Sequence, residues 1–271
     1  MADTAQIALV PATEVARTAT IRQSLNGIRY ALYGDAGTDE KEVERIVQAV
    51  PASIAASLAR KGYYFVPLTI GENPTHDAAE GGPAGFPDTG ETVIAAAYSM
   101  ELSDRAICHR NVVVDGAECV FISMRLMQDK FALAFEFFIN VGHAFLDIAG
   151  VPASFVELAW AQALADVRGE TSQDAWESRR RALGREPGSS ERTQPARIDE
   201  KAKTAFVDSA FSDAVAIYML SLTVDFDYTD LREREYPLLA APALADRLRL
   251  VAGLFPPNRG YDFSILYRRR S

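Results

Sequence analysis

A long apolar segment that carries a single polar stripe is the feature that most constrains this fold. Residues Phe131–Ala149 are apolar at almost every position. The polar exceptions recur with a helical period and are Glu136, Asn140, His143 and Asp147. At 3.6 residues per turn their side chains fall within roughly 60° of one another on a helix. A helix that is apolar on its other faces belongs inside a protein, so the chain must build a core around this segment.

The polar stripe has two interpretations, and the sequence leaves both open. Burying three ionisable groups and an amide is costly unless the groups are paired or line a cavity. The stripe can therefore mark a functional site, because ionisable groups in unusual surroundings gather where proteins bind or react. It can equally be the solvent-facing edge of a core helix, or a hydrogen-bonded network that joins this helix to a sheet.

The composition indicates an acidic globular protein. Its 271 residues, 48% of them hydrophobic, are enough for one large domain or two small ones. The net charge of -9 repels phosphate groups, so nucleic acid and membrane surfaces are poor partners. No secretion signal is visible, and the stripe interrupts the most apolar stretch. We predict a soluble, cytoplasmic protein, with signal-less export left open, in which Cys108 and Cys119 are free and buried.

Helical patterns dominate the first 61 residues. Apolar spacing predicts a helix over Thr13–Tyr33. A capping pattern that begins at Thr38 predicts a second helix, which ends before Pro51, and a third follows over Ser53–Arg60. We therefore expect residues 1–61 to form an N-terminal helical segment.

The next part of the chain has a strand pattern. Its β-branched and aromatic runs predict a small, mostly antiparallel sheet. Pro67 lies inside the first run and predicts an edge strand, because proline cannot donate to a ladder. Asp115-Gly116 predicts a short hairpin between the last two runs. The predicted strands are Gly62–Ile70, Thr92–Met100, Ala106–Val114 and Glu118–Met124.

The remainder of the chain is predicted to be helical. Residues near 173–200 are rich in charge, Gly, Pro and Ser, which is typical of a mobile surface segment. The fold class is therefore α+β, with residues 62–271 forming one domain that ends in a helical subdomain. The predicted helices are Leu126–Arg168, broken at Gly150-Val151-Pro152, then Ile198–Leu222 and Ala243–Phe255.

The polar stripe also contains part of a metalloprotease motif. The run Ile139-Asn140-Val141-Gly142-His143-Ala144 has the frame of the zincin motif His-Glu-x-Gly-His-Ala. In that motif two histidines one turn apart bind Zn²⁺, and the glutamate activates a water molecule. The longer segment 142–150 resembles the Gly-His-Ala…Asp…Ala-Gly stretch of the anthrax lethal factor-like metalloprotease family. The active-site helix of that family also follows a small sheet, so the resemblance implies a zincin-like fold.

The resemblance covers about the C-terminal half of the chain and extends to a later helix. In the family this helix carries Glu-Phe-Phe-Ala-Glu-Ala-Phe, which supplies the third zinc ligand. The similar segment here is 209–215, with Ser209 at the position of the ligand and Asp213 at the position of the second acid. A shift of one residue places Asp208 at the ligand position instead.

The substitutions remove most of the family chemistry. Ile139 replaces the first histidine and has no donor atom, while Asn140 replaces the glutamate and cannot accept a proton from water near neutral pH. Ser209 is a poor zinc ligand. Peptide hydrolysis by the zincin mechanism is therefore not expected. The first hypothesis is a pseudoprotease without a cofactor, which acts as a binding or accessory module. Its former active-site cleft would hold a protein partner or a small-molecule ligand.

The second hypothesis is an enzyme that uses the same cleft for different chemistry on a small molecule. His143 would be the acid or base, Asp147 or Glu136 would orient its imidazole, and Asn140 would be a polarising donor. A variant of this hypothesis places a divalent metal ion at His143, with Glu136, Asp147 or Asp213 as the oxygen ligands.

Two other polar segments are interpreted as surface. His109 lies on a predicted strand, where an outward-facing side chain is the simplest interpretation. Asp225-Phe226-Asp227-Tyr228 is an acidic and aromatic loop that lacks the spacing of a calcium-binding loop.

Overall fold

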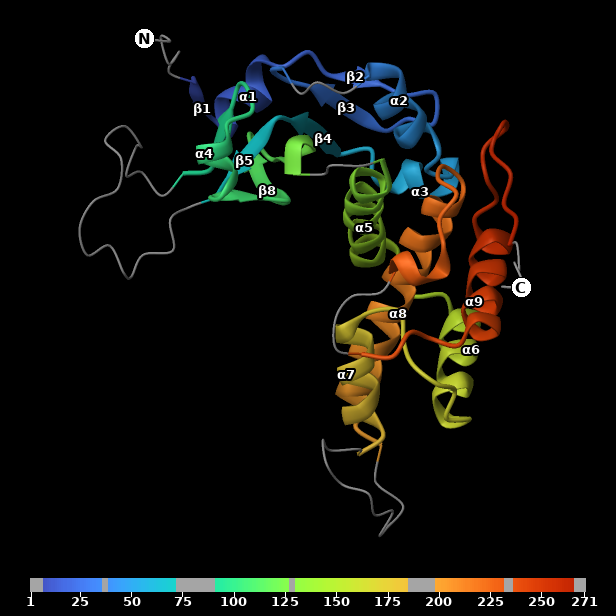
Figure 1. Ribbon diagram of the computed structural model, residues 1–271. Coiled ribbons are helices and arrows are strands. Elements are labelled where there is room, and N and C mark those ends of the chain that lie inside the picture. The colour runs from blue at the N-terminus through green and yellow to red at the C-terminus, as the bar shows by residue number, and fades with distance from the viewer. Residues whose placement is uncertain are drawn as a thin grey trace, which may run out of the picture. The chain divides into compact units, whose positions relative to one another are not determined.

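The computed structural model describes residues 7–35, 39–71, 91–126, 130–184, 198–231 and 236–265. These residues form helices and two small sheets (Figure 1), which confirms the predicted α+β class. The chain divides into two compact units, and neither begins at residue 62. Unit 1 comprises Met1–Gln48 and Leu58–Glu136, and unit 2 comprises Ala49–Ser57 and Phe137–Ser271.

The larger sheet of unit 1 is mixed. The pairs β3–β4 and β4–β9 are parallel, whereas β2–β3 and β8–β9 are antiparallel. The parallel pairs lie at the centre of the sheet, so this sheet is not the mostly antiparallel one that the sequence predicts. Its strands, in spatial order, are β2 (Arg22–Gln23), β3 (Arg29–Leu32), β4 (Lys61–Val66), β9 (Ala117–Ser123) and β8 (His109–Val114).

The smaller sheet of unit 1 is antiparallel throughout its described strands. The prediction that Pro67 marks an edge strand is wrong, because β4 lies between β3 and β9. Pro67 instead separates β4 from β5, at the point where the chain leaves one sheet and enters the other. A proline is tolerated there because its missing N–H is not needed in either ladder. The strands, in spatial order, are β1 (Leu9–Pro11), β6 (Val93–Ala95), β5 (Leu68–Ile70) and β7 (Ala106–Ile107).

The first 61 residues are only partly helical. The predicted helix over Thr13–Tyr33 is wrong after α1 (Ala12–Thr18), because the chain continues into the hairpin of β2 and β3. The turn of this hairpin contains Gly27 with φ +97°, a conformation that glycine adopts without strain. Helices α2 (Glu40–Gln48) and α3 (Ala52–Ser57) confirm the two helices predicted around Pro51.

The core of unit 1 joins α1 to the larger sheet. Ala12 and Val15 of α1 are fully buried beside Tyr64 of β4 and Phe121 of β9. The last two rings stack with centroids 4.9 Å apart. Burying an apolar side chain of this kind contributes about 1.5–3 kcal/mol, so these contacts are a main source of stability for unit 1.

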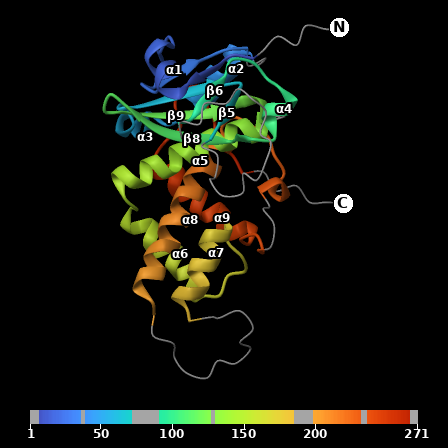
Figure 2. The same cartoon turned by 90° about the vertical axis from the view of Figure 1, so that its left-hand side faces the viewer.

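Unit 2 is a helical bundle that contains most of α5 (Lys130–Ala149). Helix α8 packs on its neighbours α6, α7 and α9, as Figure 2 shows. Where α8 is most deeply buried, Phe211 meets the ring of Phe155 edge-on at 5.1 Å. Every described residue from Ala210 to Leu220 is buried except Asp213, which is partly buried. The bundle helices after α5 are α6 (Ala153–Leu164), α7 (Gln173–Ala182), α8 (Glu200–Ser221) and α9 (Ala241–Leu254).

The segment near residues 173–200 is predicted to be mobile, but its first part forms helix α7. The helix begins where the hydroxyl of Ser172 accepts a hydrogen bond from Ala175 N–H at 3.2 Å. Ala175 and Ala182 are fully buried, so packing overrides the polar composition of this segment. Residues 185–197 of the predicted segment lie outside the described residues.

Helix α5 meets the length and composition of a membrane-spanning helix, and it is the only helix of the described residues that does so. Half of its most apolar stretch is buried inside the structure. A core helix of a soluble protein passes the same test, so this observation bears only weakly on localisation.

Candidate functional site

The polar stripe of α5 passes from one unit into the other. Glu136 is the last residue of unit 1, and the other three stripe residues belong to unit 2. Asn140 is buried, whereas His143 and Asp147 are exposed. The stripe therefore changes from buried to solvent-facing along the helix. Its C-terminal half, at His143 and Asp147, is the exposed edge of a core helix.

Glu136 forms an unexpected ion pair within unit 1. Its carboxylate lies 2.5 Å from Nδ1 of His109, the first residue of β8. The Glu136 side chain is 18% exposed and that of His109 is 40% exposed. The carboxylate fixes the imidazole through Nδ1 and leaves Nε2 available, which is how proteins orient a histidine for proton transfer. His109 is exposed, as the sequence predicts, and its imidazole is in addition paired with a carboxylate.

Cys108 lies beside this pair. It is a free and exposed cysteine, which corrects the prediction that both thiols are buried; Cys119 is free and buried as predicted. Partial burial, and secondarily the negative charge of Glu136, raise the pKa of the Cys108 thiol. A raised pKa keeps the thiol protonated at neutral pH, so Cys108 is not an activated nucleophile.

Asp213 belongs to α8 in unit 2, where two hydroxyl groups bind its carboxylate. Thr171 Oγ1 donates a hydrogen bond of 2.8 Å, and the side chain of Ser172 also bonds to it. Burial raises the pKa of Asp213 to about 6, although the two hydroxyl groups and the charge of Arg247 oppose this shift.

The possible metal ligands His143, Asp147 and Asp213 are not brought together. Within the described ranges, no group of three or more His, Cys, Asp or Glu side chains is arranged to hold a metal ion. Asp147 lies close enough to Asp208 for its negative charge to raise the pKa of Asp208, after the larger effect of burial. Two carboxylates that repel each other in this way do not by themselves complete a ligand set.

Gly142, the glycine of the motif frame, has a packing role. A Cβ atom at this position would lie 2.7 Å from the backbone carbonyl oxygen of Ser212 in α8. Helices α5 and α8 can therefore approach closely only because residue 142 has no side chain. The glycine that contributes to the family resemblance is thus explained by helix packing alone.

A buried ionic network in unit 2 has no signal in the sequence. Glu170 and Arg247 are fully buried, and Arg247 Nη1 lies 2.8 Å from Glu170 Oε2. Arg179 Nη1 lies 3.0 Å from Glu170 Oε1 and donates to the carbonyl of Gly169 at 2.9 Å. Arg247 Nε donates to Gln162 Oε1 at 2.8 Å. The network joins the segment after α6 to α7 and α9, so its role is structural.

Strand β8 is the last strand of its sheet. It pairs with β9 on one side, and no described strand pairs with its other side. The hairpin loop is Asp115-Gly116, with φ of 51° and 79°, which confirms the predicted short turn. Ser123 N–H donates to the carbonyl of Cys108 at 2.8 Å, so these two residues form a hydrogen-bonded pair. Along an antiparallel ladder such pairs alternate with pairs that share no hydrogen bond. Consequently the backbone groups of His109, Asn111 and Val113 point to the open side.

We compared the chain with known protein families, curated proteins and solved structures. No protein-family model, curated protein or solved structure matches this chain. The resemblance to the lethal factor-like family therefore depends on the residues of the motif and on the order of the elements around it.

Proposed function

We propose that this protein is a degenerate zincin-like metalloprotease that acts as a peptide-binding or protein-binding module. The observation that carries the proposal is the open edge of β8. Three residues of this strand, His109, Asn111 and Val113, are exposed and direct backbone N–H and C=O groups outward. An edge strand of this kind can accept an extended segment of a partner as an additional strand.

The side chains of β8 support the same function. Val113 is 69% exposed and would provide an apolar contact for a partner side chain. At the other end of the strand, the ion pair of His109 with Glu136 holds a polar group beside the backbone. The partner would therefore meet an apolar position and a charged position on one exposed face.

The motif residues of α5 agree with binding rather than hydrolysis. Ile139 and Asn140 occupy the positions of a zinc ligand and the catalytic base, and neither residue can perform that role. Gly142 is explained by the contact of its backbone with α8. The helix frame can thus persist for structural reasons after the zinc chemistry has been lost.

Peptide selection on the purified full chain tests the proposal. Peptides that bind would be selected from a random phage-displayed library and measured as synthetic peptides. Asn111→Pro removes one outward N–H and leaves the bonds to β9 in place, so we expect at least about tenfold weaker binding. The matched control Asn111→Ala retains the N–H and should bind within about twofold of the wild type. Equal binding by both variants would exclude docking on β8.

Zinc analysis tests the pseudoprotease part separately. The protein would be incubated with Zn²⁺, dialysed and assayed for bound metal and for cleavage of fluorogenic peptides. We expect no cleavage. Stoichiometric zinc that is lost in His143→Ala, together with cleavage, would contradict the proposal.

A second candidate function is an enzyme that acts on a small molecule. The observation that favours it is the pair of His109 Nδ1 and Glu136 at 2.5 Å, since an oriented imidazole is a suitable general base. In this candidate His109 takes the role that the sequence assigns to His143. An activity that His109→Ala abolishes, and that His143→Ala leaves intact, would establish it.

A further inference from the structure

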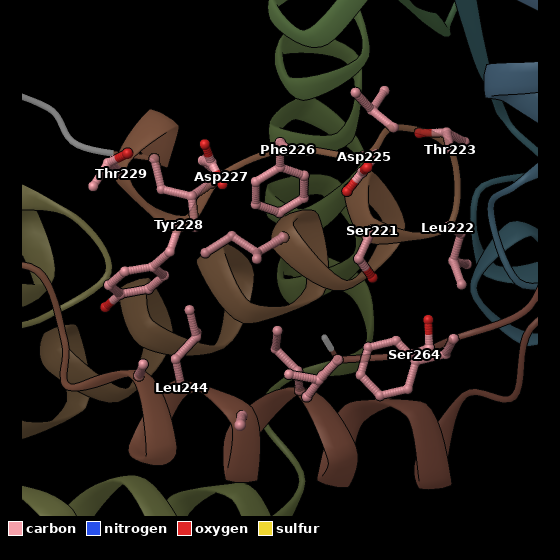
Figure 3. A pocket seen from close by; sticks show the side chains of 18 residues that line it. Ser221, Leu222, Thr223, Asp225, Phe226, Asp227, Tyr228, Thr229, Leu244 and Ser264 are labelled. Atoms are coloured by element: carbon pink, nitrogen blue, oxygen red, sulfur yellow. The ribbon is translucent and has the colours of Figure 1, made fainter. Parts of the chain in front are cut away.

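Unit 2 contains a pocket of about 640 Å³ that the proposed function does not use. Figure 3 shows the side chains that line it, which come from the end of α8, the loop that follows, α9 and the segment near residue 264. A volume of this size lies in the range of small-molecule sites in proteins. It matches a ligand of the size of a fused aromatic compound or larger.

The walls of the pocket are held by contacts of their own. Tyr218 donates a hydrogen bond of 2.8 Å to the carbonyl of Phe255 and packs edge-on against Phe263, which lines the pocket. On α9, Leu244 and Leu248 are at most 6% exposed. The pocket is therefore preformed and apolar in its interior, and an apolar ligand would enter it without first ordering the walls.

The loop after α8 brings two carboxylates to the pocket. Asp225, Phe226 and Asp227 all line the pocket, and Figure 3 shows the two carboxylates on either side of the phenylalanine ring. Both aspartates are exposed. The described lining residues include no lysine, arginine or histidine. Two carboxylates beside an aromatic ring favour a cation, through ion pairing and through the negative face of the ring.

The loop that carries these carboxylates is ordered by its own hydrogen bonds. The Asp230 carboxylate accepts a bond of 2.8 Å from Asp227 N–H, and Asp230 N–H donates to the carbonyl of Asp227 at 2.8 Å. Leu231 follows and is buried against unit 2. The backbone of the loop at Asp227 is thus ordered beside the apolar interior.

We propose that this pocket binds a small amphiphilic organic cation. Its apolar or aromatic body would lie between α8 and α9, and its protonated amine would contact Asp225 and Asp227 at the mouth. The site lies wholly in unit 2 and does not depend on β8, so it can be tested independently of the proposed function.

Calorimetric titration of the full chain with two matched probes tests this site. The probes are 1-naphthylmethylamine and 1-naphthaleneacetate, which share the aromatic body and carry opposite charges. We expect the amine to bind with Kd below about 1 mM and at least about tenfold more tightly than the acid. Added NaCl should reduce this preference, because exposed ion pairs are screened by salt.

Two kinds of variant separate the charge from the cavity. The double variant Asp225→Asn with Asp227→Asn should lose the preference for the amine while its thermal unfolding stays within a few degrees of the wild type. Leu244→Trp and, independently, Ser221→Trp should fill the cavity and reduce binding of the amine at least about tenfold. Two filling variants are used so that one remains if the other fails to fold.

The proposal is overturned by any of three results. These are an amine that does not saturate the wild type near about 1 mM, an acid that binds as tightly as the amine, or folded filling variants that bind the amine as the wild type does. The last result would place the probe elsewhere on the protein.

Discussion

Removing the charge of Glu170 should destabilise unit 2 more than the loss of any exposed ion pair would. Glu170 is fully buried and contacts two guanidinium groups. Its distances are 2.8 Å and 3.3 Å to Arg247, and 3.0 Å to Arg179. The substitution Glu170→Gln retains the shape of the side chain but leaves two buried cations without their shared anion. Breaking a buried ion pair in this way costs about 3–5 kcal/mol, and we expect a loss in that range.

The remaining contacts, which include the charge of Asp213 near Arg247, compensate only partly for the lost charge. Asp166 lies 3.8 Å from Arg179 but is 53% exposed, so its interaction is weakened by solvent. Gln162 offers Arg247 a neutral acceptor only. The two guanidinium groups would therefore remain buried and undercompensated.

Urea unfolding at pH 7, followed by far-ultraviolet circular dichroism, measures the effect, and thermal unfolding checks it. The matched control is Asp246→Asn, which breaks the exposed pair with Arg249 on the same α9 helix. That pair is more than half exposed on both sides, so the control should lose less than about 1 kcal/mol. A loss below about 1 kcal/mol for Glu170→Gln would refute the inference that the network stabilises unit 2.

Two further predictions concern α8 and its contact with α5. Folding raises the pKa of Asp213 from 3.8 to about 6, so this residue favours the folded state most below pH 4 and loses that contribution as the pH rises through 6. The lost free energy of unfolding amounts to at most about 3 kcal/mol. Asp213→Asn should remove this pH dependence when unfolding is measured from pH 4 to 7. Gly142→Ala places a Cβ 2.7 Å from the Ser212 carbonyl oxygen and should cost about 1–3 kcal/mol, whereas the control Gly253→Ala meets no atom within 4 Å and should be neutral or stabilising. An unchanged melting temperature for Gly142→Ala would contradict the close packing of the two helices.

Elements with a strong local pattern could be predicted from the sequence. The periodic apolar residues of α5 and the break before Pro152 place two helices close to their observed bounds. Asp115-Gly116 specifies a two-residue hairpin, because both residues tolerate positive φ. These features depend on neighbouring residues only, so they are visible in a single sequence.

The hairpin of β2 and β3 was missed because its strands are short and take their stability from pairing. Asn26-Gly27 is a turn signal in the sequence, but the apolar spacing around it also fits a helix. Strand β3 pairs with β4, which lies about thirty residues later in the chain. Such a ladder is decided by tertiary contacts, which override the weak helical preference of a short segment.

The sequence by itself determined the α+β class and the long helix α5. Only the tertiary structure decided the partners of the polar groups. It joined Glu136 to His109, and it placed Glu170 between Arg179 and Arg247. The physical reason is that backbone preference and apolar period are local, whereas the partner of a buried charge is set by folding of distant segments around a common core.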